Sequence, residues 1–247
     1  VDRSDHAYLK RVFIINDGSD HETTTWLETF CQTKSTFELI NNPTNIGYTK
    51  TVNKGLRLSQ SDYVITLNSD TVIPKNLING MLSCFSSDPQ IGVVGPLSNA
   101  ASWQNIPNLI GDDGKFAINK IPFDLNTDQF NSIIKNSSRH RFPKVEFVNG
   151  FCFMIRKDVL NNIGLLDEDA FPMGYGEEND LCLRVSEAGY KLAIADNCYV
   201  FHAKSKSFGS DKKAKLSQIG HQKLIQKHGD RFIDKLEQTK QSCSLNQ

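Results

Sequence analysis

The sequence of 247 residues lacks several features that would assign it to particular classes of protein. Its formal net charge is zero, so no basic field over the whole molecule favours nucleic-acid binding. No apolar run approaches the roughly 20 residues that a membrane-spanning helix needs, and the chain does not start with the layout of a signal peptide. It has no internal repeat and no linker that would divide it, and we therefore expect one soluble domain with a sizeable core.

Paired cysteines and a dinucleotide-binding glycine turn are also missing. The six cysteines are scattered, with no CxxC pair and no small disulfide framework, so reduced thiols in a cytoplasmic protein are our interpretation. No G-x-G-x-x-G run follows a first strand, which argues against a nicotinamide-dependent dehydrogenase. The cysteines are Cys31, Cys84, Cys152, Cys182, Cys198 and Cys243.

Short apolar runs alternate with amphipathic stretches in the first part of the chain. Residues 12–15, 37–40 and 62–67 are typical of buried strands, and residues 21–33 and 48–60 between them are typical of helices. This order predicts an α/β fold with right-handed crossovers and a mostly parallel sheet flanked by helices.

The second part of the chain is less regular. Residues 74–87 are predicted to form a helix and residues 91–97 a strand, but residues 98–142 lack firm periodicity. A compact domain rarely keeps such a loop without a use, so we interpret it as a lid or acceptor-side segment. The elements expected beyond it are a strand at 145–156 interrupted by Asn149-Gly150, helices at 158–163 and 180–188, strands at 191–195 and 198–201, and a helix or helix pair at 211–241 interrupted at Gly229.

Polar residues follow two of the predicted strands. Asn16 to Asp20 (NDGSD) follows the first strand, and Asn68-Ser69-Asp70 follows the third. Open α/β sheets bind ligands beyond the carboxyl ends of their strands, where a carboxylate can ligate a hard divalent cation. Asp70 is therefore a candidate metal ligand. The alternative is that Asn68, Ser69 and Asp70 only form a turn and cap a helix, which these residue types favour.

An acidic cluster begins the helix expected near residues 180–188. Glu177-Glu178-Asn179-Asp180 follows a polar, glycine-bearing connection, residues 164–176. A carboxylate within hydrogen-bond reach of a hydroxyl group is a suitable general base. The alternative is that the acids cap the helix and pair with Arg184 or with lysines, because the dipole at a helix start favours negative charge.

Charge is uneven near the end of the chain. From Ala203 to Gln247 the sequence carries ten basic and four acidic residues. Such a tail can contact anionic lipid or a phosphorylated partner, although a solvated basic helix is the more ordinary interpretation. The basic residues are Lys204, Lys206, Lys212, Lys213, Lys215, Lys223, Lys227, Arg231, Lys235 and Lys240, and the acidic ones are Asp211, Asp230, Asp234 and Glu237.

Several segments of the chain, in this order and spacing, resemble those of a family 2 glycosyltransferase of the GT-A fold, of the bacterial surface-polysaccharide type. The resemblance covers nearly the whole chain up to about Phe208. The matching segments are VFIINDGSD (12–20), NIGYTKTVNKGL (45–56), LNSDT (67–71), GPLSN (95–99), GFCFMIR (150–156), GLLD (164–167), GYGEENDLCLR (174–184) and YVFH (199–202).

The resemblance implies a GT-A (Rossmann-like) domain over residues 1–208, with residues 209–247 as a basic helical carboxyl-terminal extension of the same domain. It implies an inverting glycosyltransferase that moves a sugar from a nucleoside-diphosphate sugar, of the UDP or dTDP type, to a hydroxyl group of a saccharide or lipid-linked acceptor in polysaccharide biosynthesis. We expect no nucleic-acid partner. We expect a cytoplasmic protein, and peripheral contact with the inner face of the cell membrane would run through the basic carboxyl-terminal helix.

The resemblance also implies a nucleotide pocket. Asp17 would contact the base of the nucleotide sugar. The other residues that would shape the pocket are Asn45, Gly47, Asn53, Asn68 and Ser69.

The metal site and the catalytic base are implied in the same way. Asp70, at the last position of the family's DxD element, and His202 would hold a divalent metal that bridges the donor diphosphate and stabilises the leaving group. Mn²⁺ tolerates mixed carboxylate and imidazole ligation better than Mg²⁺ does and is our first choice. Glu178, at the second acidic position of the family's ED motif, would be the base, with Glu177 and Asp180 competing for that role.

The sequence departs from the family pattern at three places. Asn68 stands where many relatives have the first Asp of the metal-binding element, and Glu178 stands where the base is usually Asp. Relatives also begin with a strand and a Pro-x-Tyr-Asn-like turn, for which Val1 to Arg11 are too short, so we expect an amino-terminally truncated chain. These departures keep a second function open, a non-catalytic sugar-nucleotide-binding module of a larger polysaccharide synthase.

Overall fold

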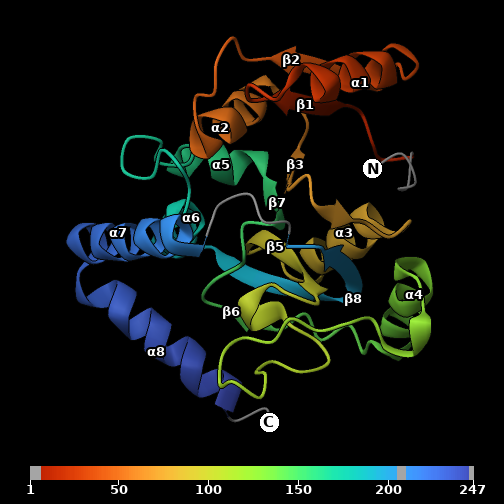
Figure 1. Ribbon diagram of the computed structural model, residues 1–247. Coiled ribbons are helices and arrows are strands. Elements are labelled where there is room, and N and C mark those ends of the chain that lie inside the picture. The colour runs from red at the N-terminus through yellow and green to blue at the C-terminus, as the bar shows by residue number, and fades with distance from the viewer. Residues whose placement is uncertain (1–6, 205–209, 245–247) are drawn as a thin grey trace.

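Strand β7 (Cys152–Arg156) directs its successive side chains to opposite faces of a central sheet. The computed structural model describes residues 7–204 and 210–244 (Figure 1). Phe153 and Ile155 belong to the hydrophobic core on one face, whereas Cys152 and Met154 belong to the core on the other. Both faces of the sheet are therefore buried, which requires helices on both sides.

The strands of the described residues form two sheets. A six-stranded sheet has the order β3-β7-β5-β8-β4, with β6 paired to β8 outside this path, and β1 and β2 form a separate pair. The remaining strands are β1 (Val12–Asn16), β2 (Phe37–Asn41), β3 (Tyr63–Leu67), β4 (Thr71–Val72), β5 (Ile91–Ser98), β6 (Lys144–Val145) and β8 (Lys191–His202).

Helices cover the two faces of the six-stranded sheet unequally. The core on one face takes side chains from α2, α5, α6, α7 and α8, and the core on the other takes them mainly from α3. The helices are α1 (His21–Gln32), α2 (Tyr48–Leu58), α3 (Leu77–Ser87), α4 (Thr127–Ser137), α5 (Lys157–Ile163), α6 (Glu177–Glu187), α7 (Ser210–His228) and α8 (Asp230–Ser244), with short 3₁₀ helices at Ser102–Gln104 and Pro122–Asp124.

The α/β class and the flanking helices agree with the sequence analysis, but the prediction of a mostly parallel sheet was wrong. Only the pairs β1/β2 and β5/β8 are parallel among the described strands, and the other four pairs are antiparallel. The alternation of strand and helix that predicts parallel pairing ends at β5. After the long segment of residues 98–142, β7 enters between β3 and β5 and runs opposite to both.

This topology still brings several strand ends to one edge of the sheet. Because β3 and β5 are both antiparallel to β7, and β8 is parallel to β5, the strands β3, β5 and β8 run in the same direction. Their carboxyl ends therefore lie at a common edge. The residues that follow or end them there are Asn68 to Asp70, Asn99 and His202.

The segment of residues 98–142 contains a helix that the sequence analysis missed. Helix α4 begins with a capping box in which Asn126 and Gln129 each bond the other's backbone amide. Phe130 of α4 packs edge-on against Tyr199 of β8, with ring centroids 4.7 Å apart. The Asn-x-x-Gln spacing was a usable signal, but the surrounding Asn, Asp and Pro residues masked it.

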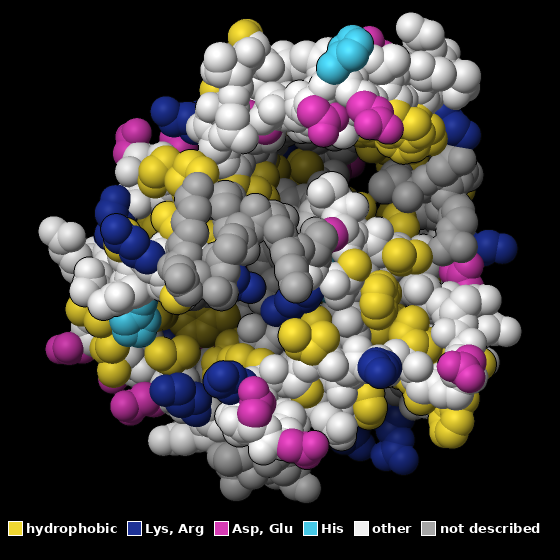
Figure 2. All heavy atoms as spheres, in the orientation of Figure 1, with side chains coloured by type: hydrophobic (Ala, Val, Ile, Leu, Met, Phe, Trp, Pro, Cys, Tyr) yellow, Lys and Arg dark blue, Asp and Glu magenta, His cyan; other side chains and the backbone are white. Residues whose placement is uncertain are grey.

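The carboxyl-terminal helix pair was predicted correctly, including its break at Gly229, whose φ is 56°. The domain boundary expected after residue 208 and Lys206 of the basic tail lie outside the described residues. Within the described ranges, no helix combines the length and the apolar character needed to cross a membrane. On the face seen in Figure 2, Lys and Arg side chains are interspersed with hydrophobic and acidic ones and form no continuous basic patch.

Candidate active site

Asp70 and His202 meet because short antiparallel pairing joins the tip of β3 to the end of β8. Thr71 of β4 pairs with His202, and the amide of Ala203 donates a hydrogen bond to the Asp70 carbonyl at 2.9 Å. The His202 Nε2 atom consequently lies 3.3 Å from Asp70 Oδ1. The structure thus brings together the two residues that we expected to share a metal.

The surroundings of His202 decide which ring nitrogen faces Asp70. Nδ1 lies 3.1 Å from the carbonyl oxygen of Ala100, an acceptor, so the hydrogen is assigned to Nδ1 and the lone pair to Nε2. Asn99 accepts from the His202 amide at 2.7 Å and donates to its carbonyl at 3.0 Å. Burial lowers the pKa of His202 while Asp70 opposes the shift, which favours the neutral imidazole that ligates metals.

The donor atoms of this pair fit a divalent cation such as Mn²⁺. A carboxylate oxygen and an imidazole lone pair that face each other at this separation can bind one ion together. No group of three or more His, Cys, Asp or Glu residues that could hold a metal occurs in the described part of the chain. The remaining coordination positions would therefore fall to water or to oxygens of a bound ligand.

The turn at the tip of β3 is held at both ends. The Asn68 amide donates to the Phe151 carbonyl at 2.8 Å, and the Thr71 hydroxyl donates to the Asn68 carbonyl at 2.8 Å. The Asn68 side-chain oxygen accepts from the hydroxyl of Tyr48 at 3.3 Å, whereas Ser69 is exposed at the turn. Asn68 is therefore oriented by Tyr48.

Tyr48, the first residue of α2, links this turn to the acidic helix. Its hydroxyl also lies 3.5 Å from the carbonyl oxygen of Gly150. Burial raises the pKa of Tyr48, and the charges of Glu177, Glu178 and Asp70 raise it further. Tyr48 is thus within electrostatic reach of both groups of acids. Tyr48 was not predicted as a site residue, because a tyrosine at a helix start does not by itself indicate a functional role.

Glu177 and Glu178, which we call the acid pair, occupy the first turn of α6. Glu177 is 5% exposed, and its carboxylate accepts from the amide of Gly176, the N-cap, at 3.0 Å. Glu178 packs against Gly150, and its Oε2 atom is buried without a hydrogen-bond partner among the described residues. Burial raises the pKa of both carboxyl groups, and the charge of Glu178 raises that of Glu177 further. Such groups are suited to proton transfer.

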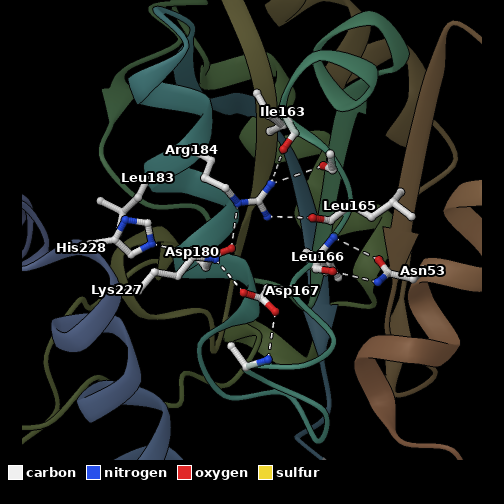
Figure 3. Close-up of polar contacts among 12 residues, drawn as sticks. Asn53, Ile163, Leu165, Leu166, Asp167, Asp180, Leu183, Arg184, Lys227 and His228 are labelled. Carbon is white, nitrogen blue, oxygen red and sulfur yellow. Dashed lines mark hydrogen bonds and ion pairs between the residues drawn. The ribbon is translucent and has the colours of Figure 1, made fainter.

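Asp180 lies in a different environment, shown in Figure 3. It is fully buried, with Arg184 Nε at 2.8 Å, Lys227 Nζ at 2.7 Å and His228 Nε2 at 2.8 Å from its carboxylate oxygens. Burial alone would raise the pKa of Asp180, but Lys227, Arg184 and His228 hold it below the ordinary value. A carboxylate surrounded by donors is a poor base, and this geometry matches the alternative in which acids pair with Arg184 and lysines.

The side chain of Asn53 is hydrogen-bonded to the loop that follows α5. Its side chain is fully buried, accepts from the Leu166 amide at 3.1 Å and donates to the Leu166 carbonyl at 2.9 Å (Figure 3). It also donates to Glu168 at 2.7 Å. These bonds make Asn53 a link between α2 and that loop.

Asp17 organises the turn that precedes α2. One carboxylate oxygen accepts from Asn42 and from the Ile46 amide, both at 2.9 Å, and the other accepts from the Gly47 amide at 3.1 Å. The Asn45 side chain donates to the Asp17 carbonyl at 3.0 Å. Partial burial would raise the pKa of Asp17, but these hydrogen bonds hold it below its ordinary value. Asp17, Asn45 and Gly47 are therefore brought together, as expected.

Lys204 is a second residue near the site that the sequence did not single out. It was predicted only as part of the basic tail. It lies two residues beyond His202, with a φ of 52°. Burial lowers the pKa of Lys204, while the charge of Asp70 opposes that shift. A cation within electrostatic reach of Asp70 is suited to contact an anionic ligand.

Comparison with known proteins identifies relatives for most of the chain. The family model described as Glycosyl transferase family 2 matches residues 3–164. The poly-beta-1,6-N-acetyl-D-glucosamine synthase of Staphylococcus epidermidis (strain RP62A) is 24% identical over 162 residues, which are 65% of this chain and 35% of that protein. The enzyme of the same name from Staphylococcus aureus (strain COL) is 21% identical over 220 residues, 87% of this chain and 48% of that protein. The chain spans less than half the length of these relatives.

Solved structures with the same fold are more distant in sequence. GalNAc-T7 with UDP, GalNAc and Mn²⁺ has a TM-score of 0.61 at 18% identity, over 81% of this chain and 39% of that one. The mannosyltransferase PcManGT of Pyrobaculum calidifontis, in complex with GDP-Man and Mn²⁺, has a TM-score of 0.57 at 12% identity, over 99% and 69%. S. aureus TarS in complex with UDP has a TM-score of 0.53 at 14% identity, over 93% and 62%. These similarities confirm the GT-A type of α/β fold.

Proposed function

The chain belongs to glycosyl transferase family 2, and we propose that it transfers a sugar, with inversion, from a nucleoside-diphosphate sugar to a hydroxyl group of a saccharide or lipid-linked acceptor. The product would be a surface polysaccharide, as the printed names of the staphylococcal relatives suggest for those proteins. The reaction would take place in the cytoplasm.

The observation that carries this proposal is that Tyr48 lies within electrostatic reach of two groups of acids. On one side, Asp70 Oδ1 and His202 Nε2 face each other at 3.3 Å and can hold a divalent metal. On the other side is the acid pair, in which the Oε2 atom of Glu178 has no hydrogen-bond partner in the described part of the chain. A leaving diphosphate and an incoming hydroxyl group need these two kinds of group close together.

Glu178 would act as the general base. The reaction needs the acceptor hydroxyl to lose its proton as its oxygen attacks the anomeric carbon and the bond to the diphosphate breaks. The buried Oε2 atom of Glu178 has no hydrogen-bond partner among the described residues and can accept that proton. Its raised pKa keeps it basic enough for the task. Glu177, held by the Gly176 amide, would orient its neighbour.

Asp70 and His202 would hold the metal, Mn²⁺ in preference to Mg²⁺, which when bound supplies positive charge to the leaving diphosphate. Lys204 would add a second positive charge there. Asp17, Asn45 and Gly47 form a turn whose amide and carboxylate groups would contact the nucleoside, with uridine or thymidine preferred. Asn68 would reach the donor through the orientation that Tyr48 imposes on it.

Calorimetry of the full chain with UDP, with and without Mn²⁺, tests the donor site. We expect Mn²⁺ to strengthen binding, and Asp70→Ala and His202→Ala each to abolish that gain while the protein stays folded, because both residues lie at strand ends. Asp113→Ala is the matched control, because the Asp113 carboxylate is exposed and contacts Lys115 locally, with an ion pair at 3.8 Å and a hydrogen bond from its amide at 3.0 Å. Unchanged Mn²⁺-dependent affinity in the Asp70 variant would contradict the proposal.

Donor hydrolysis or sugar transfer separates an enzyme from a binding module. If the chain binds the nucleotide in a Mn²⁺-dependent way but turns over no donor with any saccharide or lipid-linked acceptor, the non-catalytic sugar-nucleotide-binding module becomes the better description. Equal affinities for uridine, thymidine, guanosine and adenosine diphosphates would count against the proposed base preference.

A further inference from the structure

Four of the basic residues of the carboxyl-terminal tail form a stripe that faces the protein. Lys223, Lys227, Arg231 and Lys235 recur at every fourth position and run from α7 into α8. Each contacts a group in the segment before α6, in α6 itself or near β6. The contacts are Lys223 with the Ala170 carbonyl at 2.6 Å, Lys227 with Asp167 and Asp180 at 2.7 Å each, Arg231 with Glu187 at 2.9 Å and with the Leu183 carbonyl at 3.2 Å, and Lys235 with Glu146 at 2.7 Å.

The central partner of this stripe is Asp180, which lies in the first turn of α6 together with the acid pair. Asp180 is fully buried and receives Lys227 and His228 from α7, as well as Arg184 from its own helix (Figure 3). Arg184 also donates to the carbonyls of Ile163 and Leu165 at 2.7 and 2.8 Å. We call these four side chains the Asp180 clamp. It ties α6, α7 and the loop after α5 to one carboxylate.

A second contact lies directly at the start of α6. Gly220 of α7 packs so closely on the backbone of Tyr175 that a Cβ atom at this position would lie 1.6 Å from the Tyr175 carbonyl oxygen. No side chain fits there, so only glycine at position 220 allows α7 to pack this closely on the backbone of Tyr175. Helix α7 therefore packs against the residues just before Gly176, which is the N-cap of α6.

The turn beneath Gly220 has an unusual backbone. Gly174, Tyr175 and Gly176 have φ values of 86°, 65° and 145°. The two glycines adopt positive φ readily, but positive φ is costly for a tyrosine and persists at Tyr175 only where the surrounding structure holds it. The turn also delivers Glu177, whose carboxylate accepts from the Gly176 amide.

We infer that α7 positions the acid pair: Gly220 seats the 174–176 turn, and Lys227 and His228 hold the first turn of α6 through Asp180. The carboxyl-terminal helices are then part of the active-site framework, and their basic stripe serves this framework in place of a membrane or phosphorylated partner. Lys227 and His228 are positioning residues. The inference rests on the proposed function for its catalytic consequence, but the positioning itself can be observed without turnover.

Hydrogen–deuterium exchange of the full chain tests the positioning directly. In Lys227→Met, we expect the amides of residues 174–180 to exchange about tenfold faster, because a buried carboxylate loses a cation that holds the helix start. Lys227→Arg keeps the charge and should restore most of the protection. Lys215→Met, on an exposed position of the same helix, is the matched control and should leave exchange unchanged.

Sugar transfer measured on the same variants tests the catalytic consequence. We expect Lys227→Met to lower kcat about tenfold while the KM for the donor changes less than twofold, because only the acid pair shifts. If Lys227→Met unfolds the chain, His228→Gln, which changes the other α7 partner of Asp180, replaces it in both measurements.

The outcomes separate the two proposals. Unchanged exchange at residues 174–180 in Lys227→Met, or a kcat equal to that of the Lys215 control, overturns the positioning role. Faster exchange in a protein whose unaltered form transfers no sugar supports the positioning role and overturns the proposed function. A KM that rises with kcat unchanged also overturns the inference, because α7 would then serve donor binding.

Discussion

The acid pair and Asp180 lie within a single turn of α6, yet their surroundings are opposite. Glu177 is buried and Glu178 is partly buried, both act electrostatically on Tyr48, and the Oε2 atom of Glu178 has no hydrogen-bond partner among the described residues. Asp180 is also buried, but three donor side chains surround it at 2.7–2.8 Å. Burial raises the pKa of the acid pair, whereas the cations overcome burial and lower the pKa of Asp180.

The groups that surround each carboxylate of α6 indicate whether it is structural or a candidate for proton transfer. Burial costs a charged group free energy, and the cost is offset where cations and donors surround it. At Asp180 the cost is offset, so the carboxylate stabilises the fold and is unsuited to accept a proton. At the acid pair backbone hydrogen bonds offset it only in part, so the pKa of both groups stays raised, which is the property that the proposed base requires.

The largest expected effect comes from removing the structural carboxylate. Asp180→Ala leaves Lys227 and the partly buried Arg184 without their shared partner, and we expect the free energy of unfolding to fall by about 3 kcal/mol, the scale for breaking a buried ion pair. Urea denaturation at pH 7 measures it. Asp113→Ala should change stability by less than about 0.5 kcal/mol. A loss as small as that of the control would show that the clamp contributes little.

The next effect concerns activity at the acid pair. Glu178→Gln nearly preserves the shape of the side chain and should lower kcat about a hundredfold, equivalent to about 2.7 kcal/mol, with little change in donor affinity. Steady-state transfer assays and calorimetry measure the two quantities. If Glu178→Gln keeps its turnover while Glu177→Gln loses it, the roles within the pair are exchanged. If neither variant loses turnover, the inverting mechanism with a carboxylate base fails.

A smaller and opposite effect on stability is expected at Glu177. Its pKa is raised in the folded state, so its contribution to stability is present below the ordinary value of 4.5 and is lost as the pH rises through the folded pKa. Glu177→Gln cannot ionise and should raise Tm at pH 8 by about 2–4 °C, or about 1 kcal/mol for a chain of this size. Glu237→Gln, exposed on α8, is the control. A lower Tm in the Glu177 variant would show that its carboxylate is well accommodated.

The smallest effect is the acid dependence of the clamp. The pKa of Asp180 is lowered in the folded state, so its stabilisation is present above the ordinary value of 3.8 and is lost as the pH falls through the folded pKa. The stability difference between the unaltered chain and Asp180→Asn should therefore narrow on acidification below that value. Denaturation midpoints across this pH range measure it. A difference that is constant with pH would mean that the cations do not act on this carboxylate.

Local sequence patterns predicted most helices and strands of the fold, but they did not predict how the strands pair. Apolar runs located β1, β2, β3 and β5, and Gly229 marked the break between α7 and α8, because these signals are carried by neighbouring residues. The direction of β7 depends on how the segment of residues 98–142 crosses the molecule. No periodicity in β7 itself reports that path, so the parallel sheet was predicted wrongly.

Sequence by itself determined which residue types stand at the strand ends and at the start of α6: local patterns pointed to Asp70 and the acidic cluster, and the family resemblance added His202. Only the tertiary structure decided how those acids differ. A carboxylate's pKa and role depend on which groups fold against it, and the groups that distinguish Asp180 from Glu178 come from α7 and α2, far away along the chain. For the same reason, only the tertiary structure showed that Lys223, Lys227, Arg231 and Lys235 of the basic tail contact the rest of the protein.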